Sequence, residues 1–120
     1  MSDRLYTIEK IEEISGGKWR SEICINKNSE VFEGHFPGQP VLPGVFMLEI
    51  IASVLSEITS GSRKLIGGDN IKFLSVLDPA ADAEITAAIS FTISEEQIYN
   101  VKSELSGNGK IFLKFKGKFL

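Results

Sequence analysis

The 120-residue sequence contains only one cysteine, Cys24, and only one histidine, His35. A single cysteine excludes an internal disulfide, and one cysteine with one histidine excludes a zinc site built from several such ligands. We therefore predict that the protein holds no metal. Cys24 lies in a stretch of alternating apolar and polar residues, where it is most simply a small neutral side chain.

Long apolar runs and an excess of positive charge are also missing. The longest unbroken apolar run covers residues 45–48, whereas a helix needs about 20 apolar residues to cross a bilayer. The first four residues do not begin a signal peptide, so we expect a cytoplasmic protein without membrane contact. With 13 basic and 16 acidic residues the net charge is −3, which argues against a nucleic-acid partner.

The composition is that of an ordinary globular protein, with 42% hydrophobic and 24% charged residues. A chain of this length can fold as a single domain over residues 1–120, and an oligomer would add stability. Apolar and polar residues alternate in much of the chain, which predicts strands at residues 19–26, 70–77, 83–93, 98–105 and 111–119. Residues 106–109 are typical of a hairpin turn. Residues 5–14 fit either a short helix or an irregular strand.

Residues 45–58 predict one long helix, because ten of these fourteen residues are apolar. Pro43 suits the first turn of this helix, and Gly61 is a natural stop. The four polar residues form one narrow stripe and are Glu49, Ser53, Ser56 and Glu57. We expect a nearly buried central helix. The predicted fold class is α+β, a β-meander with this helix inserted early and an antiparallel sheet wrapped around it.

His35 lies in a segment that cannot form regular structure. Residues 32–44 contain three prolines and three glycines, and proline also restricts the residue that precedes it. Imidazole titrates near neutral pH, so His35 can accept a proton there. Taken alone, a single loop histidine is more often structural or simply exposed.

Two further groups lie close to His35 in sequence. Glu49 falls in the first turns of the apolar helix, and burying an ionised carboxylate without partners is costly, so Glu49 must reach solvent, a partner or a cavity. Gly44 places a backbone N–H at the positive end of the helix, where it can stabilise negative charge on a carbonyl oxygen. A base, an acid and an oxyanion donor together suit proton abstraction next to a thioester carbonyl, followed by loss of a β-hydroxyl.

At these residues the sequence resembles a known family. The run Gly-His-Phe-Pro-Gly-Gln-Pro-Val-Leu-Pro-Gly-Val at residues 34–45, followed by Met-Leu-Glu at 47–49, is similar to the motif of the FabZ-type 3-hydroxyacyl-[acyl-carrier-protein] dehydratases. The resemblance implies the hot-dog fold, in which a curved antiparallel sheet wraps around one long central helix. Weaker similarity runs from about residue 6 to residue 82.

The resemblance also implies a role for each matched residue. His35 corresponds to the base that removes the α-proton, Glu49 to the acid that protonates the departing hydroxyl, and Gly44 to the glycine whose N–H polarises the thioester carbonyl. We place Phe36, Val45 and Ser53 beside them as substrate-binding residues. The implied reaction is dehydration of 3-hydroxyacyl thioesters to trans-2-enoyl thioesters in fatty-acid or polyene-like biosynthesis.

The family pattern further implies which partners the protein uses. The substrate is carried on the phosphopantetheine of an acyl carrier protein, and no separate cofactor is needed. The enzyme is a homodimer whose sites combine the histidine of one chain with the glutamate of the other, and a trimer of dimers is compatible with this. Two alternatives remain: a hot-dog acyl-thioesterase, and a catalytically silent acyl-binding subunit.

The sequence departs from the family pattern in two places. Ser53 replaces a glutamine, and residues 73–82 lack a basic pair and a glycine that the family has there. Because carrier proteins are acidic, docking needs a local basic patch on this negatively charged chain. Of the remaining candidates we favour Arg63 and Lys64 over Lys18, Arg20 and Lys72. Lys114, Lys116 and Lys118 are more simply the solvated face of a strand.

Overall fold

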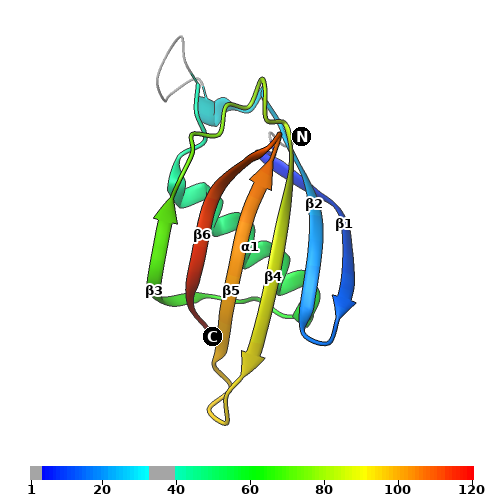
Figure 1. Cartoon of the computed structure of the whole chain (residues 1–120), viewed down its shortest axis with the longest axis vertical. Helices are drawn as coiled ribbons and strands as arrows, with labels where there is room; N and C mark the ends of the chain where they lie inside the picture. Colours follow the sequence, from blue (N-terminus) through cyan, green and yellow to red (C-terminus); the bar gives the residue numbers. More distant parts are fainter. Residues whose placement is uncertain (1–3, 33–39) are drawn as a thin grey trace.

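The computed structural model describes residues 4–32 and 40–120, which form a six-stranded sheet and one long helix. The elements in chain order are β1 (Tyr6–Ser15), β2 (Lys18–Ile25), the short 3-10 helix η1 (Glu30–Phe32), α1 (Gly44–Thr59), β3 (Leu65–Phe73), β4 (Glu84–Ile93), β5 (Tyr99–Gly107) and β6 (Lys110–Phe119). The strand order is β1-β2-β4-β5-β6-β3, and the five pairings are antiparallel (Figure 1). The expected α+β fold, a curved sheet around one helix, is confirmed.

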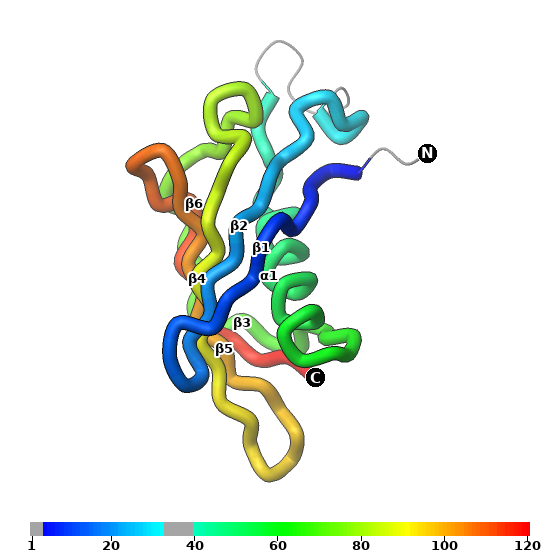
Figure 2. Tube along the Cα trace, turned by 90° about the vertical axis from the view of Figure 1, so that its right-hand side faces the viewer, coloured from blue at the N-terminus to red at the C-terminus, as the bar shows by residue number. Residues whose placement is uncertain are grey.

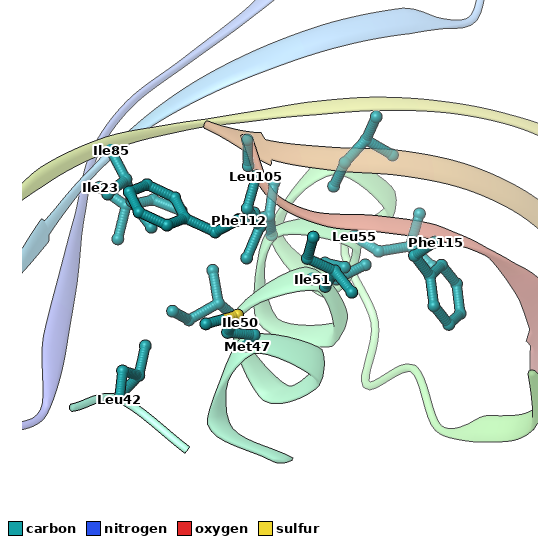
Figure 3. Close-up of a cluster of buried hydrophobic side chains, with 14 of the residues drawn as sticks. Ile23, Leu42, Met47, Ile50, Ile51, Leu55, Ile85, Leu105, Phe112 and Phe115 are labelled. Carbon is teal, nitrogen blue, oxygen red and sulfur yellow. The ribbon is translucent and has the colours of Figure 1, made fainter. Parts of the chain in front are cut away.

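The core lies between α1 and the face of the sheet on which it packs (Figures 2 and 3). Fully buried apolar side chains of α1 meet apolar side chains of the sheet, and these residues include Ile50, Ile51, Leu55, Leu105, Phe112 and Leu113. Each such side chain stabilises the fold by about 1.5–3 kcal/mol relative to an exposed position. No helix covers the opposite face of the sheet in the part of the chain that the structure describes (Figure 2).

The observed helix lies where the sequence predicted it, but more of its surface is exposed than predicted. It spans Gly44–Thr59, and Ser60, not Gly61, adopts the left-handed conformation that ends it, with φ 53°. The prediction of a nearly buried helix was wrong for the chain by itself. Val45 is 67% exposed and Glu49 is also exposed, because a single sheet can cover only one side of a helix.

The structure resolves residues 5–14 in favour of the strand. This segment forms β1, and two register shifts against β2 explain why its pattern is irregular. The alternating patterns behind β2, β4, β5 and β6 are confirmed, as is the β5–β6 hairpin turn. Asn108 and Gly109 both have positive φ there, as a tight two-residue turn requires.

The strand expected at residues 70–77 was misplaced. β3 begins at Leu65 and ends at Phe73, and residues 74–83 contain no strand. Gly67 and Gly68 interrupt the alternation of apolar and polar side chains that predicts a strand, since glycine has no side chain. β3 also crosses to the far edge beside β6, so the sheet is not a simple meander.

Within residues 4–32 and 40–120, no helix is both long enough and apolar enough to cross a bilayer.

Candidate active site

The structure places four of the six predicted site residues on the first ten residues of α1. His35 and Phe36 lie outside the described residues, so their predicted roles stay predictions. Val45, Glu49 and Ser53 follow one another at intervals of four residues, which places them on one face of the helix. This face points away from the core and includes the stripe of polar residues predicted from the sequence.

The polar stripe lines a hollow of about 760 Å³ between α1 and β1. The lining residues are Arg4, Tyr6, Thr7, Ile8, Glu49, Ala52, Ser53, Ser56, Glu57, Ser62 and Arg63. Glu49 is exposed within it, so its carboxylate reaches a space that can hold a ligand instead of the apolar core. The requirement that Glu49 meet solvent or a cavity is thus met.

Tyr6 is a polar residue of this hollow that the sequence pattern did not identify. Its hydroxyl forms a hydrogen bond with the Ser53 hydroxyl, 2.5 Å between oxygens, from the first residue of β1. Burial raises the pKa of Tyr6, the hydrogen bond with Ser53 lowers it, and the nearby charge of Glu49 raises it, with a net upward shift. Tyr6 is therefore protonated at neutral pH and remains a hydrogen-bond donor beside Glu49.

No local signal in the sequence could have paired Tyr6 with Ser53. The two residues are 47 positions apart, and they meet only because β1 is an edge strand beside the exposed side of α1. In the family that the sequence resembles, a glutamine stands at the position of Ser53. Here a short serine and a long tyrosine together occupy the space between the helix and β1.

Arg63 supplies a cation on the rim of the same hollow and is held there by several contacts. Its Nε donates a hydrogen bond to Thr59 Oγ1 at 2.8 Å, and its backbone N–H donates to Ser56 Oγ at 2.9 Å. The guanidinium also lies over the ring of Tyr99, 4.4 Å from the ring centre. Arg63 is therefore a fixed part of the structure, whereas the neighbouring Lys64 is exposed.

Gly44 lies at the start of α1, on a different side of the helix from Glu49. Pro43 precedes it in an extended conformation, and the first N–H groups of a helix have no partner within that helix. A side chain at Gly44 would meet the ring of Phe73 in β3, because a Cβ atom at this position would lie 2.6 Å from Phe73 Cζ. Gly44 thus has a packing role as well as the predicted oxyanion role.

Gly44 and Glu49 lie five positions apart in α1, so their side-chain directions differ by about 140° around the helix axis. A Cβ atom on Gly44 would face Phe73 of β3, and Glu49 faces the hollow beside β1; these two strands are the opposite edges of the sheet. The backbone N–H of Gly44 points along the helix axis, so its direction is independent of these side-chain directions.

The hollow beside Glu49 carries few groups of the kinds that bind metal ions. In residues 4–32 and 40–120 no three His, Cys, Asp or Glu side chains lie close enough together to hold an ion. The hollow beside Glu49 offers one further carboxylate, Glu57, together with hydroxyls and the cationic Arg63. This set suits a polar organic ligand with a hydroxyl group.

Sequence comparison places this architecture among the dehydratases. The ApeI-like family, described as ApeI dehydratase, matches residues 11–110. The FabZ 3-hydroxyacyl-[acyl-carrier-protein] dehydratase of Haemophilus influenzae is 33% identical over 70 residues, 58% of this chain and 47% of that protein. The FabZ of Lactobacillus helveticus is 35% identical over 82 residues, 60% of this chain and 54% of that protein. The chain thus spans about half the length of the curated relatives it matches.

Solved structures support the fold over nearly the whole chain. A structure described as the dehydratase heterocomplex ApeI:P from Xenorhabdus doucetiae matches 94% of this chain and 96% of that chain, with a TM-score of 0.67 and 18% identity. A mutant thioesterase from Pseudomonas aeruginosa matches 93% of this chain and 78% of that chain, with a TM-score of 0.62 and 16% identity. At these identities the likeness establishes a shared fold, which is the hot-dog fold expected from the sequence.

Proposed function

The chain belongs to the ApeI-like dehydratase family, and on this premise we propose that it converts 3-hydroxyacyl thioesters to trans-2-enoyl thioesters and water. One observation carries the proposal. Glu49, which follows His35 by fourteen residues, is exposed in a hollow of ligand size on the face of α1 that points away from the core. A carboxylate in this position can reach a substrate hydroxyl.

The proposed reaction removes a proton and a hydroxyl from neighbouring carbon atoms. His35 takes the proton from the α-carbon, and the Gly44 N–H donates a hydrogen bond to the thioester oxygen, on which negative charge develops. The electron pair left on the α-carbon forms the double bond as the bond from the β-carbon to oxygen breaks. Glu49 gives its proton to the departing hydroxyl, which leaves as water, and the His35 proton then restores Glu49.

The geometry of α1 favours a site that two chains share. Gly44 packs against β3 and Glu49 lines the hollow beside β1 at the opposite edge of the sheet, which is compatible with a site that a second chain completes. The β3 edge supports such an association, because an unpaired edge strand is a template for pairing with another chain. Exposed apolar residues gather there and just after it, namely Ile66, Ile71, Phe73, Leu74 and Val76.

The partner at this edge is, in the simplest case, a second copy of the chain. A related chain is the alternative, since the neighbour from Xenorhabdus doucetiae is described as a heterocomplex. We propose an acyl carrier protein as the donor of the substrate, on its phosphopantetheine arm, because the curated relatives are named for carrier-bound substrates. No separate cofactor takes part in the proposed steps.

A second candidate reaction is hydrolysis of the thioester. The observation in its favour is the fold shared with the Pseudomonas thioesterase, together with an exposed carboxylate on the helix. A thioesterase releases a free thiol and a carboxylic acid, whereas a dehydratase keeps the thioester and loses one water, so mass spectrometry of carrier-bound substrate separates the two reactions.

A mixing experiment tests the reaction and the shared site together. His35→Ala and Glu49→Gln should each lower turnover about 10²–10⁴-fold, because each removes a proton-transfer group. Unfolding and re-forming a mixture of the two variants should restore about a quarter of the wild-type rate, because about half of the dimers are mixed and each mixed dimer has one intact site.

Two outcomes would contradict the proposal. Release of free thiol without an enoyl product would assign the protein to the thioesterases. Failure of verified mixed dimers to regain activity, although the wild-type protein is active after the same treatment, would place His35 and Glu49 of one site in a single chain.

A further inference from the structure

The face of the sheet opposite α1 carries a hollow of about 600 Å³, distinct from the hollow beside Glu49. Figure 2 shows this face uncovered by any helix along the described chain. We call this hollow the basic groove. Six long cationic side chains line it, and they come from four strands, β2, β3, β5 and β6: Lys18, Arg20, Lys72, Lys102, Lys114 and Lys116.

The register of the sheet explains why these cations gather. One row across the strands runs Lys18, Ser90, Lys102, Lys116 and Asn70, and the next runs Arg20, Ala88, Glu104, Lys114 and Lys72. In both rows β4 contributes the small residue, Ser90 or Ala88, while its neighbours β2 and β5 contribute longer ones. The groove therefore follows β4. The strands that flank it are about 9.6 Å apart, close to the width of an α-helix.

The charge in the basic groove is poorly compensated. Lys102 lies directly opposite Lys116, and Lys72 lies directly opposite Lys114, although like charges in such pairs destabilise a sheet. Arg20 has an ion pair with Glu12 at 3.4 Å, but the five lysines have none within residues 4–32 and 40–120.

The groove also differs in charge from the rest of the molecule. Among residues 4–32 and 40–120, Glu104 is the only acidic residue that lines it, against six basic ones. The remainder of the chain holds seven basic and fifteen acidic residues, so positive potential is concentrated on this face of an acidic protein. Lys114 and Lys116 are therefore part of a patch to which four strands contribute cations, and not simply the outer face of one strand.

The shape of the groove favours an elongated occupant with an apolar side. A second hollow of about 360 Å³ adjoins it and shares Lys18, Ser90, Lys102 and Lys116, so the depression continues along β4. Apolar surface is available at its edge, where Ile14 is 54% exposed, and on its floor, where Ala88 of β4 is exposed.

We propose that the basic groove docks an acidic amphipathic helix of a partner protein, with carboxylates toward the two flanks of cations and apolar side chains toward Ala88 of β4 and Ile14. A second copy of this chain does not fit, because its own basic groove would be repelled. A flat anionic bilayer would meet the raised flanks and leave the floor empty. The sheet separates the groove from Glu49, so the docked helix leaves the candidate active site free.

A fluorescently labelled peptide makes the proposal directly measurable, because its anisotropy rises when it binds the protein. The probe is a synthetic peptide of about four helical turns with leucines on one face and glutamates on the other. Titration with protein should give a saturable rise in anisotropy that weakens as salt is raised. Lys102→Glu with Lys116→Glu should weaken binding at least about tenfold, because two attractive contacts become repulsive.

A matched double variant separates the groove from net charge. Lys10→Glu with Lys27→Glu makes the same change in net charge at exposed lysines that do not line the groove, and it should bind the peptide as the wild type does. Lys102→Gln with Lys116→Gln is the milder groove variant, for use if the reversed pair does not fold. The proposal is overturned if both doubly reversed variants lose affinity equally, or if a scrambled peptide of the same composition binds equally well. It is also overturned if labelled phosphatidylglycerol vesicles or labelled duplex DNA bind the protein and the peptide does not.

Discussion

Asp82→Asn should destabilise the protein more than its single atom change suggests. The Asp82 side chain is fully buried, and it joins the irregular segment at residues 74–83 to the β5–β6 hairpin. Its carboxylate accepts hydrogen bonds from the Asp78 backbone N–H at 3.0 Å, from Lys110 Nζ at 3.2 Å and from Asn108 Nδ2 at 3.3 Å. In asparagine an NH2 group replaces one carboxylate oxygen, so it would face one of these N–H donors without being able to accept its hydrogen bond.

The magnitude follows from those contacts. A hydrogen bond to a charged group contributes about 1.5–3 kcal/mol, and Lys110 is 41% exposed, so its share is reduced by solvent. We expect Asp82→Asn to lower the free energy of unfolding by about 2–3 kcal/mol. This corresponds to a fall of about 10 °C in melting temperature for a chain of this size.

The effect should also depend on pH. Burial by itself raises the pKa of Asp82, but the hydrogen bonds from Asp78, Asn108 and Lys110 and the charge of Lys110 lower it below its ordinary value of 3.8. The carboxylate therefore stabilises the fold fully above that value, and the contribution is lost as the pH falls through the lower folded-state pKa. The stability difference between wild type and variant should shrink in the same window.

Urea denaturation at pH 7 and at several pH values below 4, at one protein concentration, measures both quantities. Asp69→Asn is the matched control, because Asp69 pairs with Lys118 at 2.9 Å while both side chains are more than 40% exposed. It should cost less than about 1 kcal/mol. An equal loss in the two variants would refute the reasoning. The Leu77 carbonyl accepts a hydrogen bond from the Leu42 N–H at 2.9 Å, and Leu42 belongs to the motif that precedes α1. Loosening residues 74–83 should therefore also disturb this motif and lower turnover.

Two further substitutions test the surroundings of the candidate site. Tyr6→Phe should lower the free energy of unfolding by about 1 kcal/mol and slow turnover, because the Ser53 hydroxyl loses its partner beside Glu49. If Tyr6→Phe causes the same losses in a Ser53→Ala background, the two hydroxyls do not act together. Gly44→Ala should lower the free energy of unfolding by about 1–2 kcal/mol, because the new methyl group meets the Phe73 ring, while the backbone N–H is kept. Phe73→Leu in the Gly44→Ala background should restore most of that stability in thermal melts. If it does not, the strain lies elsewhere.

Much of this protein could be predicted from local sequence. The period of two in β4, the long apolar run of α1 and the Asn108-Gly109 turn each depend on neighbours a few residues apart, so their positions follow from the sequence. The loop motif around His35 and the position of Glu49 on the exposed side of the helix can likewise be predicted from local sequence. Prediction from local sequence failed where glycines interrupted the alternating pattern of β3 and where register shifts disturbed that of β1.

The remaining features needed the tertiary structure, because they depend on where distant segments meet. The crossing of β3 to the edge beside β6 set Phe73 against Gly44, and the position of β1 brought Tyr6 to Ser53. Pairing register aligned cations of four strands into one groove, although each strand alone shows only alternating charge. A shift of one residue in any pairing would turn those side chains to the other face, so local sequence cannot specify the groove without the register that the whole sheet provides.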